Sequence, residues 1–238
     1  MIEDMHWLGI RWSEGPDCGG DFAPYEQSAR RAHYLEAWRR LRDGGFIYPC
    51  TCSRKDLAQA ASAPNDLDDE PIYPGHCRGR RDGPSFAAPA GVNWRFRLLD
   101  EEKIGFVDLN LGERIYVAGR DFGDFLVWRR DDVPSYQLAV AVDDAVMKIT
   151  EVVRGADLLK STARQLLLLR ALGLEAKTPA YFHCELLRDA FGTRLAKRHD
   201  ALSIRQLREN GTTPERVLEL TFRSTTGADF SNLSELHG

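Results

Sequence analysis

Long apolar runs and an export signal are both missing from this sequence. The 238-residue chain has no apolar run approaching the roughly 18 to 20 uncharged residues of a membrane-spanning helix. Its first residues, MIEDMHWLGIRW, contain neither the basic segment nor the apolar segment of a secretory signal peptide. These absences argue against membrane insertion and export, and they favour a cytoplasmic protein with no membrane partner.

The sequence also lacks an excess of positive charge, and its cysteines do not form a disulfide framework. The chain has 32 Lys and Arg against 36 Asp and Glu, a formal net charge of −4. It therefore cannot coat nucleic acid through bulk charge, and an RNA partner must meet a local basic surface. Five cysteines are an odd number in a chain without an export signal. They are better interpreted as thiols, some of them available to a metal.

The residues that are present predict an α/β fold. Hydrophobic residues make up 43% of the chain, enough for a substantial core. Apolar spacing predicts helices at 26–43, 156–174 and 212–223, and short strands at 94–100, 103–109, 114–119 and 124–130. Gly44, Gly45 and Gly173 supply helix ends, and Thr213 with Pro214 supplies a helix start. Residues 135–155 mix helical and extended signals. Strands interleaved with helices indicate an α/β layer architecture.

A loop-rich insert at residues 60–92 interrupts this pattern, and three cysteines lie around it. Cys50 and Cys52 form a C-x-C pair in YPCTCSR, and Cys77 follows in YPGHCRGR. Zinc binds thiolates in a tetrahedron, so these three need a fourth ligand. His76 is a common zinc donor but directly adjoins Cys77, whereas Tyr73 is spaced more comfortably. The alternative is that the cysteines are simply small buried residues.

A second candidate site is the basic stretch TRLAKRHDALSIR at residues 193–205. Lys197 and Arg198 stand among small residues just ahead of a predicted helix. A mobile basic loop of this kind suits a polyphosphate. An ordinary solvated loop is the alternative interpretation.

Taken together, these stretches resemble the glutamyl-type class I aminoacyl-tRNA synthetases. RLAKR resembles the KMSKS-type loop, and YPCTCSR with IYPGHCRGR resembles the zinc-binding insert of that family. The segment 133–165, VPSYQLAVAVDDAVMKITEVVRGADLLKSTARQ, resembles the part that holds glutamate. HWLGIRWSEGPD and PYEQSARRAHY match the same family upstream. The resemblance runs from about residue 1 to residue 205, with the motifs in order.

The resemblance implies a class I synthetase Rossmann-type catalytic domain with an inserted zinc-binding, loop-rich subdomain. The implied segments are 1–45 and 119–205 for the two parts of the catalytic domain, 46–118 for the insert and 206–238 for a short helical tail. Tyr136 and Arg154 would bind glutamate, Arg154 through a bidentate fork to a carboxylate. A core aromatic residue and an ordinary ion pair are the alternatives for these two.

The same resemblance assigns the remaining sites. Lys197 would be catalytic and would bind ATP from the KMSKS-type loop, which consists of Arg194, Leu195, Ala196, Lys197 and Arg198. A structural Zn²⁺ would be held by Cys50, Cys52, Tyr73 and Cys77. Asp143 and Asp144 are interpreted as a turn or solvated edge without chemistry. Arg78, Arg80 and Arg81 could meet tRNA phosphates, but an exposed charge run is the more common explanation.

The short segment after Arg205 favours one branch of the family, the glutamyl-Q tRNA(Asp) synthetases. Members of this branch activate glutamate with ATP, used with Mg²⁺, and attach it to the queuosine base of tRNA(Asp). A monomer is expected for the full-length protein. No HIGH-type motif occurs in the 238 residues, so this chain alone is expected not to activate glutamate. The alternatives are a fragment of an ordinary glutamyl-tRNA synthetase and a non-catalytic, zinc-stabilised RNA-binding protein.

Overall fold

The computed structural model describes residues 1–52, 72–79, 86–186 and 203–225 of the chain. These residues form two compact units, one from 1–25 with 184–238 and the other from 26–183, called unit 1 and unit 2 below. Within the described residues, no helix is both long and apolar enough to cross a membrane. The domain boundaries expected from the sequence remain a prediction.

The first long helix of unit 2 lies where the sequence predicts it. A 3₁₀ turn, η1 (Gln27–Arg30), leads into α2 (Arg31–Asp43). Tyr34, Trp38 and Leu41 are fully buried along one face of α2, the i, i+4, i+7 spacing of an amphipathic helix. Gly45 ends the turn after the helix with φ +73°, a backbone conformation that costs glycine little.

A three-stranded antiparallel sheet packs against α2. It has the order β1–β2–β5, from β1 (Ile47–Cys50), β2 (Asn93–Phe96) and β5 (Leu126–Trp128). Trp94 of β2 meets Trp38 edge to face, with ring centroids 5.0 Å apart, the geometry that aromatic pairs prefer. β2 and β5 are shorter than the predicted strands at 94–100 and 124–130. This sheet positions Cys50 at the end of β1.

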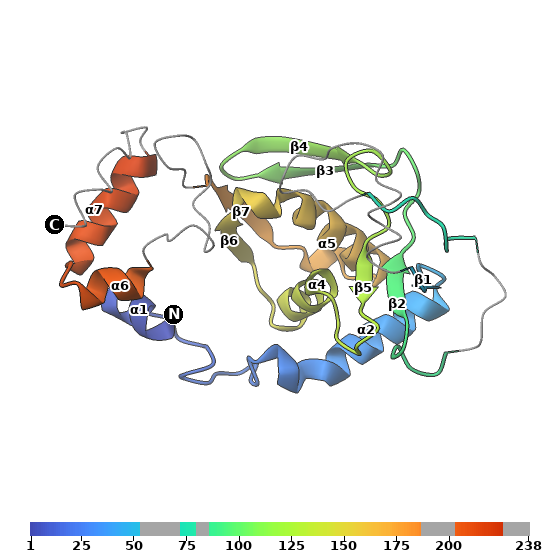
Figure 1. The fold of residues 1–238 in the computed structure, drawn as a ribbon, viewed down its shortest axis with the longest axis horizontal. Helices are drawn as coiled ribbons and strands as arrows, with labels where there is room; N and C mark the ends of the chain where they lie inside the picture. The colour runs from blue at the N-terminus through green and yellow to red at the C-terminus, as the bar shows by residue number, and fades with distance from the viewer. Residues whose placement is uncertain (53–71, 80–85, 187–202, 226–238) are drawn as a thin grey trace. The chain divides into compact units, whose positions relative to one another are not determined.

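The second sheet has four strands in the order β4–β3–β7–β6 (Figure 1). β3 (Lys103–Asp108) and β4 (Gly112–Val117) form an antiparallel hairpin, and β3 runs parallel to β7 (Ala180–Cys184). The remaining strand is β6 (Glu151–Gly155). A parallel pair needs a crossover connection, and the chain between β3 and β7, which includes α4 and α5, supplies it.

Two packed helices complete the core of unit 2, and both follow sequence signals. Residues 135–155, which read as mixed, divide into α4 (Tyr136–Val146) and β6. Ser135 caps α4 by accepting a bond from Leu138 N. A 3₁₀ turn, η2 (Ala156–Leu158), precedes α5 (Leu159–Ala171), and a further one, η3 (Glu175–Lys177), follows it. α5 packs on α4 and on β3, close to the four-stranded sheet (Figure 1).

The described part of unit 1 contains three helices, α1 (Ile2–Trp7), α6 (Ile204–Glu209) and α7 (Pro214–Thr225). Arg208 of α6 pairs with Glu3 and Asp4 of α1 at 3.5 and 3.3 Å. Thr213 accepts a bond from Arg216 N at the start of α7, which confirms the predicted helix start. Its Oγ1 satisfies one of the free N–H groups of the first helical turn.

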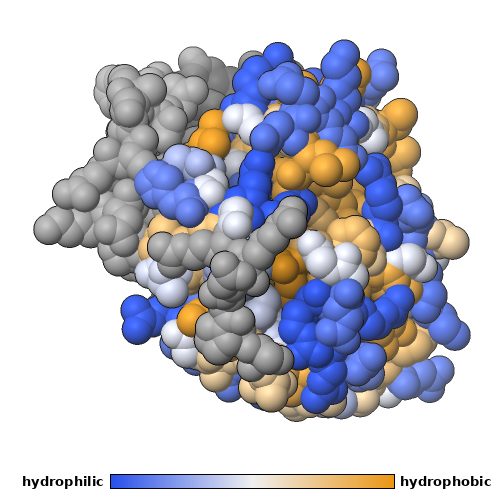
Figure 2. Space-filling model, turned by 90° about the vertical axis from the view of Figure 1, so that its right-hand side faces the viewer, coloured by the Kyte–Doolittle hydropathy of each residue, from blue (hydrophilic) through white to orange (hydrophobic). Residues whose placement is uncertain are grey.

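Figure 2 shows hydrophilic and hydrophobic patches side by side over the coloured part of the face that it draws. Large exposed apolar side chains of unit 2 include Leu99, Val107, Leu109 and Ile115. Val107 and Ile115 belong to the β3–β4 hairpin, on residue pairs two steps apart along its ladder. Scattered apolar residues of this kind are ordinary on a folded protein.

Candidate functional site

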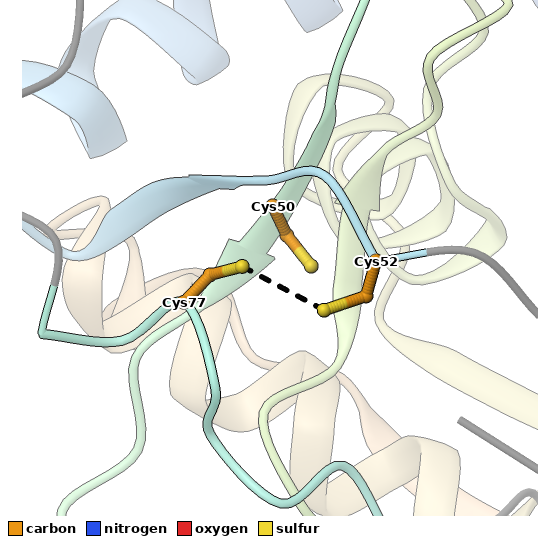
Figure 3. Close-up of side chains that lie close together, drawn as sticks. All are labelled: Cys50, Cys52 and Cys77. Atoms are coloured by element: carbon orange, nitrogen blue, oxygen red, sulfur yellow. Dashed lines mark hydrogen bonds between the residues drawn. The ribbon is translucent and has the colours of Figure 1, made fainter. Parts of the chain in front are cut away.

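The three cysteines that the sequence singles out lie together in the structure. Cys50 ends β1, Cys52 follows two residues later, and Cys77 comes from the segment 72–79. Their sulfur atoms point toward one another (Figure 3) and all lie within 4.8 Å of each other. Cys50 and Cys77 are fully buried. The cluster thus joins a strand end to a loop that is distant in the sequence.

Tyr73 adds an oxygen to this cluster. Its Oη lies 3.4 Å from Cys50 Sγ and 3.5 Å from Cys52 Sγ, and the Sγ atoms of Cys52 and Cys77 are 3.6 Å apart. A tetrahedral zinc with bonds of ~2.3 Å to sulfur and ~2.0 Å to oxygen separates its ligands by about 3.8 Å for S–S and about 3.5 Å for S–O. These three separations are compatible with a zinc site.

His76, the other candidate for the fourth position, lies elsewhere. It is exposed, and it meets the Tyr73 ring edge to face with centroids 6.4 Å apart. Among the described residues, the clustered metal-binding groups include Cys50, Cys52 and Cys77 but no histidine. The Tyr73 hydroxyl instead faces the thiols and accepts a bond from Cys77 N at 2.9 Å. Of the two alternatives, the geometry favours Tyr73.

The surroundings shift the pKa values of Cys77, Cys52 and Tyr73 in different directions. Burial opposes ionisation of Cys77, but hydrogen bonds from the Thr51 backbone, Tyr73 and the neighbouring thiols lower its pKa to about 7. Burial raises the pKa of Cys52 to about 11 and also raises the pKa of Tyr73 above its usual value. The Arg95 guanidinium lies 4.0 Å from the centre of the Tyr73 ring. Cys77 therefore ionises more readily than Cys52, and a bound cation would favour ionisation of Cys52 and Tyr73.

Arg78 is a structural residue of this region and not part of an exposed charge run. Its guanidinium donates to both oxygens of the buried Asp124 at 2.7 Å and also pairs with Asp100 at 2.8 Å. Asp124 further accepts bonds from the Tyr48 hydroxyl, at 2.5 Å, and from Leu98 N. The interpretation of Arg78 as part of an exposed charge run is wrong, because its guanidinium pairs with Asp124 and Asp100. Arg80 and Arg81 lie outside the described residues.

The second candidate centre surrounds Arg154 of β6. The guanidinium Nε donates to His183 Nε2 at 3.2 Å, and Nη2 donates to Thr162 Oγ1 at 2.7 Å and to Gln165 Oε1 at 2.9 Å. The guanidinium carbon also lies 5.3 Å from the centre of the buried Tyr181 ring. Residues from β6, α5 and β7 therefore hold this cation along one edge.

One end of the Arg154 guanidinium has no hydrogen-bond partner among the described residues. Its Nη1 is buried and makes no hydrogen bond within the part of the chain that the structure describes. Nε and Nη2 already have partners, and the bidentate fork to glutamate stays a prediction. Tyr136, at the start of α4, is 47% exposed and therefore not a core aromatic residue. A buried guanidinium N–H without a partner is costly, so Nη1 is suited to an anionic ligand.

The adjacent aspartates do not form a turn or a solvated edge. Both lie inside α4, and Asp143 is buried. Asp143 pairs with Arg30 at 2.7 Å and accepts bonds from the Tyr34 hydroxyl at 2.8 and 3.0 Å, so it ties α4 to η1 and α2. Burial raises the pKa of Asp144 to about 6, with nearby Asp143 adding to the shift and Arg154 opposing it. Asp143 thus has a structural role.

Several polar residues at the second centre were missed at the level of sequence. They share near-complete burial and hydrogen bonds that link Arg154 to the sheet and α5: Asp108, Thr162, Gln165 and His183. In the sequence, His183 is one polar residue in the apolar strand AYFHC, and nothing there indicates a partner 75 positions away. The predicted KMSKS-type loop, Arg194, Leu195, Ala196, Lys197 and Arg198, lies outside the described residues.

The comparison with protein families agrees with this organisation. The family model for the catalytic domain of class I tRNA synthetases (E and Q) matches residues 1–236. The chain therefore belongs to the class I tRNA synthetases of the E and Q type. Among solved structures it resembles glutamate–tRNA ligases from Elizabethkingia meningosepticum, in complex with its amino acid, and Elizabethkingia anophelis. The TM-scores are 0.67 and 0.68, with 27% identity, over 83% of this chain and 41% of each of those chains.

Curated relatives fall into two groups within the family. A glutamyl-Q tRNA(Asp) synthetase of Symbiobacterium thermophilum is 49% identical over 91% of this chain and 67% of its own. A second, of Nitratidesulfovibrio vulgaris, is 43% identical over 89% and 65%. Glutamate–tRNA ligase 2 of Acidithiobacillus ferrooxidans is 43% identical over 89% and 44%. The chain thus spans about two thirds of the first two relatives and less than half of the third.

Proposed function

We propose that the chain belongs to an enzyme that activates glutamate with ATP and transfers it to the queuosine base of tRNA(Asp). The relatives named glutamyl-Q tRNA(Asp) synthetase, at 49% and 43% identity, support this assignment. The observation that carries the proposal is the buried Nη1 of Arg154, which has no hydrogen-bond partner in the part of the chain that the structure describes. It offers a fixed positive charge to a carboxylate of the substrate.

Glutamate would bind between Arg154 and Tyr136. The Arg154 Nη1 would donate to one substrate carboxylate, and the half-exposed Tyr136 hydroxyl would contact the same substrate. Burial of the contact strengthens it, because water competes poorly there. A neutral amide in place of the carboxylate would lose the charge-assisted bond, which favours glutamate over glutamine.

ATP, used with Mg²⁺, would be bound from the loop 194–198. In the proposal Lys197 neutralises charge that builds on the phosphates as pyrophosphate leaves, a role that needs no proton transfer. Arg194, Leu195, Ala196 and Arg198 would complete this loop. The assignment rests on the resemblance of RLAKR to the KMSKS-type motif.

Zinc would have a structural role. Cys50, Cys52, Tyr73 and Cys77 would hold it, as their spacing and burial suggest. A bound zinc neutralises the thiolates and the phenolate and ties the segment 72–79 to β1. The zinc-binding insert and a Rossmann-type catalytic domain are then the two parts of a cytoplasmic enzyme.

The test is glutamate transfer to three purified RNAs by the polypeptide as its gene encodes it. We expect labelled glutamate on tRNA(Asp) that carries queuosine, and none on unmodified tRNA(Asp) or on tRNA(Glu). Labelling of tRNA(Glu) alone would replace the proposal with ordinary glutamate–tRNA ligase activity, which the 43% identity to the Acidithiobacillus enzyme makes the second candidate. RNA binding without glutamate transfer to any of the three would indicate a non-catalytic protein.

A further inference from the structure

A buried hydrogen-bonded chain lies behind Arg154, and the glutamate proposal does not use it. His183 has no exposed surface and Asp108 is 1% exposed. His183 Nδ1 lies 2.6 Å from Asp108 Oδ2, and its Nε2 faces Arg154 Nε at 3.2 Å. Thr162 Oγ1 is also 3.2 Å from Nε2. The hydrogen-bonded chain therefore runs from Asp108, at the end of β3, through His183 of β7 to Arg154 of β6.

The bonds of this chain define the protonation of His183. Burial opposes the charged form of Asp108, but hydrogen bonds from His183 and from the Leu111 and Asn110 backbone hold its pKa below the ordinary value. An ionised Asp108 only accepts, so His183 Nδ1 carries the proton that it donates. Arginine only donates, so Nε2 must offer a lone pair to Arg154 Nε. The neutral Nδ1–H tautomer satisfies both neighbours.

This arrangement decides which part of Arg154 is left for a ligand. His183 takes the single Nε hydrogen, while Thr162 and Gln165 take the two hydrogens of Nη2. Thr162 and Gln165 lie on one helix, α5, and hold only Nη2. The contact to His183 adds a third anchor, at a different nitrogen and from a different element, β7. Nη1 therefore stays aimed away from the three acceptors.

We propose that His183, oriented by Asp108, is a positioning residue that fixes the Arg154 guanidinium with Nη1 presented to the carboxylate of glutamate. This role rests on the proposed glutamate site. Its physical benefit is preorganisation: the donor is already oriented, so the substrate does not have to order it on binding. Asparagine and glutamine each replace one of the two ring nitrogens of His183, so the two substitutions can separate this positioning role from simple core packing.

The test compares His183→Asn with His183→Gln. The shorter Asn amide places a donor near the Nδ1 position, which preserves the bond to Asp108 but removes the acceptor for Arg154. The longer Gln amide places an oxygen near the Nε2 position, which preserves the acceptor for Arg154. We expect glutamate binding by the 238-residue chain, followed by NMR titration, to weaken at least about 10-fold in His183→Asn and less than about 3-fold in His183→Gln. Cys184→Ser, exposed on the same strand, is the matched control and should bind like the parent.

Two further measurements keep the outcomes distinct. Nitrogen-15 NMR of the unsubstituted chain should find His183 protonated at Nδ1 only, and protonation at Nε2 would overturn the inference without any variant. Arg154→Ala tests the glutamate site itself. If Arg154→Ala weakens glutamate binding while the Asn and Gln variants weaken it equally, only the role of His183 is wrong. If the unsubstituted chain and Arg154→Ala bind glutamate alike, or neither binds it, the glutamate site is wrong and the role of His183 falls with it.

Discussion

At the scale of single residues, the Arg30–Asp143 ion pair ties α4 to η1, directly before α2. The Arg30 side chain is 2% exposed and that of Asp143 11%, and the Tyr34 hydroxyl completes the group. Removing one partner leaves the other charge buried and uncompensated. We expect Asp143→Ala to lower the free energy of unfolding by about 3 to 5 kcal/mol, measured by urea denaturation.

Glu36→Ala is the control for that measurement. Glu36 also pairs with an arginine, Arg39, but its side chain is 64% exposed and the contact is 3.4 Å long. An exposed pair of this kind contributes at most about 0.5 kcal/mol. Equal losses in the two variants would contradict a special role for the buried pair.

Asp144 gives the residue-scale prediction for pH. Its pKa is about 6 in the folded protein, raised from 3.8 chiefly by burial. The folded state therefore binds this proton more tightly than the unfolded chain, and the resulting stabilisation is complete below about pH 4 and lost as pH rises through 6. We expect Asp144→Asn to raise the free energy of unfolding by about 2 kcal/mol at pH 7, and to change it little at pH 4.

The measurement is urea denaturation of both proteins from pH 4 to 8. Glu151→Gln is the control, because Glu151 is exposed at the start of β6. The difference in free energy of unfolding between Glu151→Gln and the parent protein should change little across this pH range. A stability gain from Asp144→Asn that grows toward low pH would have the wrong sign and would contradict the raised pKa.

Sequence reasoning at this scale recovered residues that are close in the chain and missed those that are joined only by the fold. Cys50 and Cys52 are neighbours, and Cys77 belongs to a motif with its own spacing, so the cluster was predictable. The partner of Asp143 is 113 positions away, and a D-D pair by itself reads as a turn. In the structure Asp143 is buried where α4 contacts η1 and α2, and no local sequence pattern indicates that contact.

At the scale of elements, helices and strands were predictable but their pairing was not. The predicted helices at 26–43, 156–174 and 212–223 correspond to α2, α5 and α7, because glycine stops and a threonine cap mark their limits. The predicted strand at 103–109 corresponds to β3. The order β4–β3–β7–β6 places Asp108 of β3 opposite Tyr181 of β7, 73 positions away, a contact without local signature. The hairpin, by contrast, joins sequence neighbours.

The zinc prediction belongs to the segment 72–79, which has little apolar core of its own. Apart from Tyr73 and Cys77, most of its residues are exposed or half-buried. A metal that ties it to β1 would supply the missing order. We expect about one zinc per chain in protein purified without chelator, measured by elemental analysis, and loss of that zinc in Cys77→Ser. Chelation should also lower the unfolding temperature of the parent.

His76→Ala is the matched control on the same segment, since His76 is exposed beside Tyr73. It should keep its zinc, whereas Tyr73→Phe should bind zinc more weakly. Loss of zinc in His76→Ala with retention in Tyr73→Phe would mean that the imidazole is the fourth ligand. Protein without zinc from the start would leave a cluster of ordinary buried thiols.

At the scale of the whole molecule, the proposed reaction divides between two sites that should fail in different ways when altered. Arg154 is proposed to hold a carboxylate in both ground and transition states, so its loss removes binding. Hydrogen bonds to charged groups contribute about 1.5 to 3 kcal/mol, which corresponds to about 10- to 150-fold. We expect Arg154→Ala to raise KM for glutamate by roughly that factor in glutamate-dependent pyrophosphate exchange.

Lys197→Ala should show the complementary defect. Its proposed partner is the departing pyrophosphate, whose charge develops in the transition state, so the substitution should lower kcat by about 10² to 10³ while leaving KM for glutamate nearly unchanged. Pyrophosphate exchange by the polypeptide as its gene encodes it measures both constants in one assay. Lys197→Arg, which keeps the positive charge, should recover part of the rate. Interchanged defects, with KM altered by Lys197→Ala and kcat by Arg154→Ala, would reverse the two assignments, because an interaction made only in the transition state cannot appear as a loss of ground-state binding.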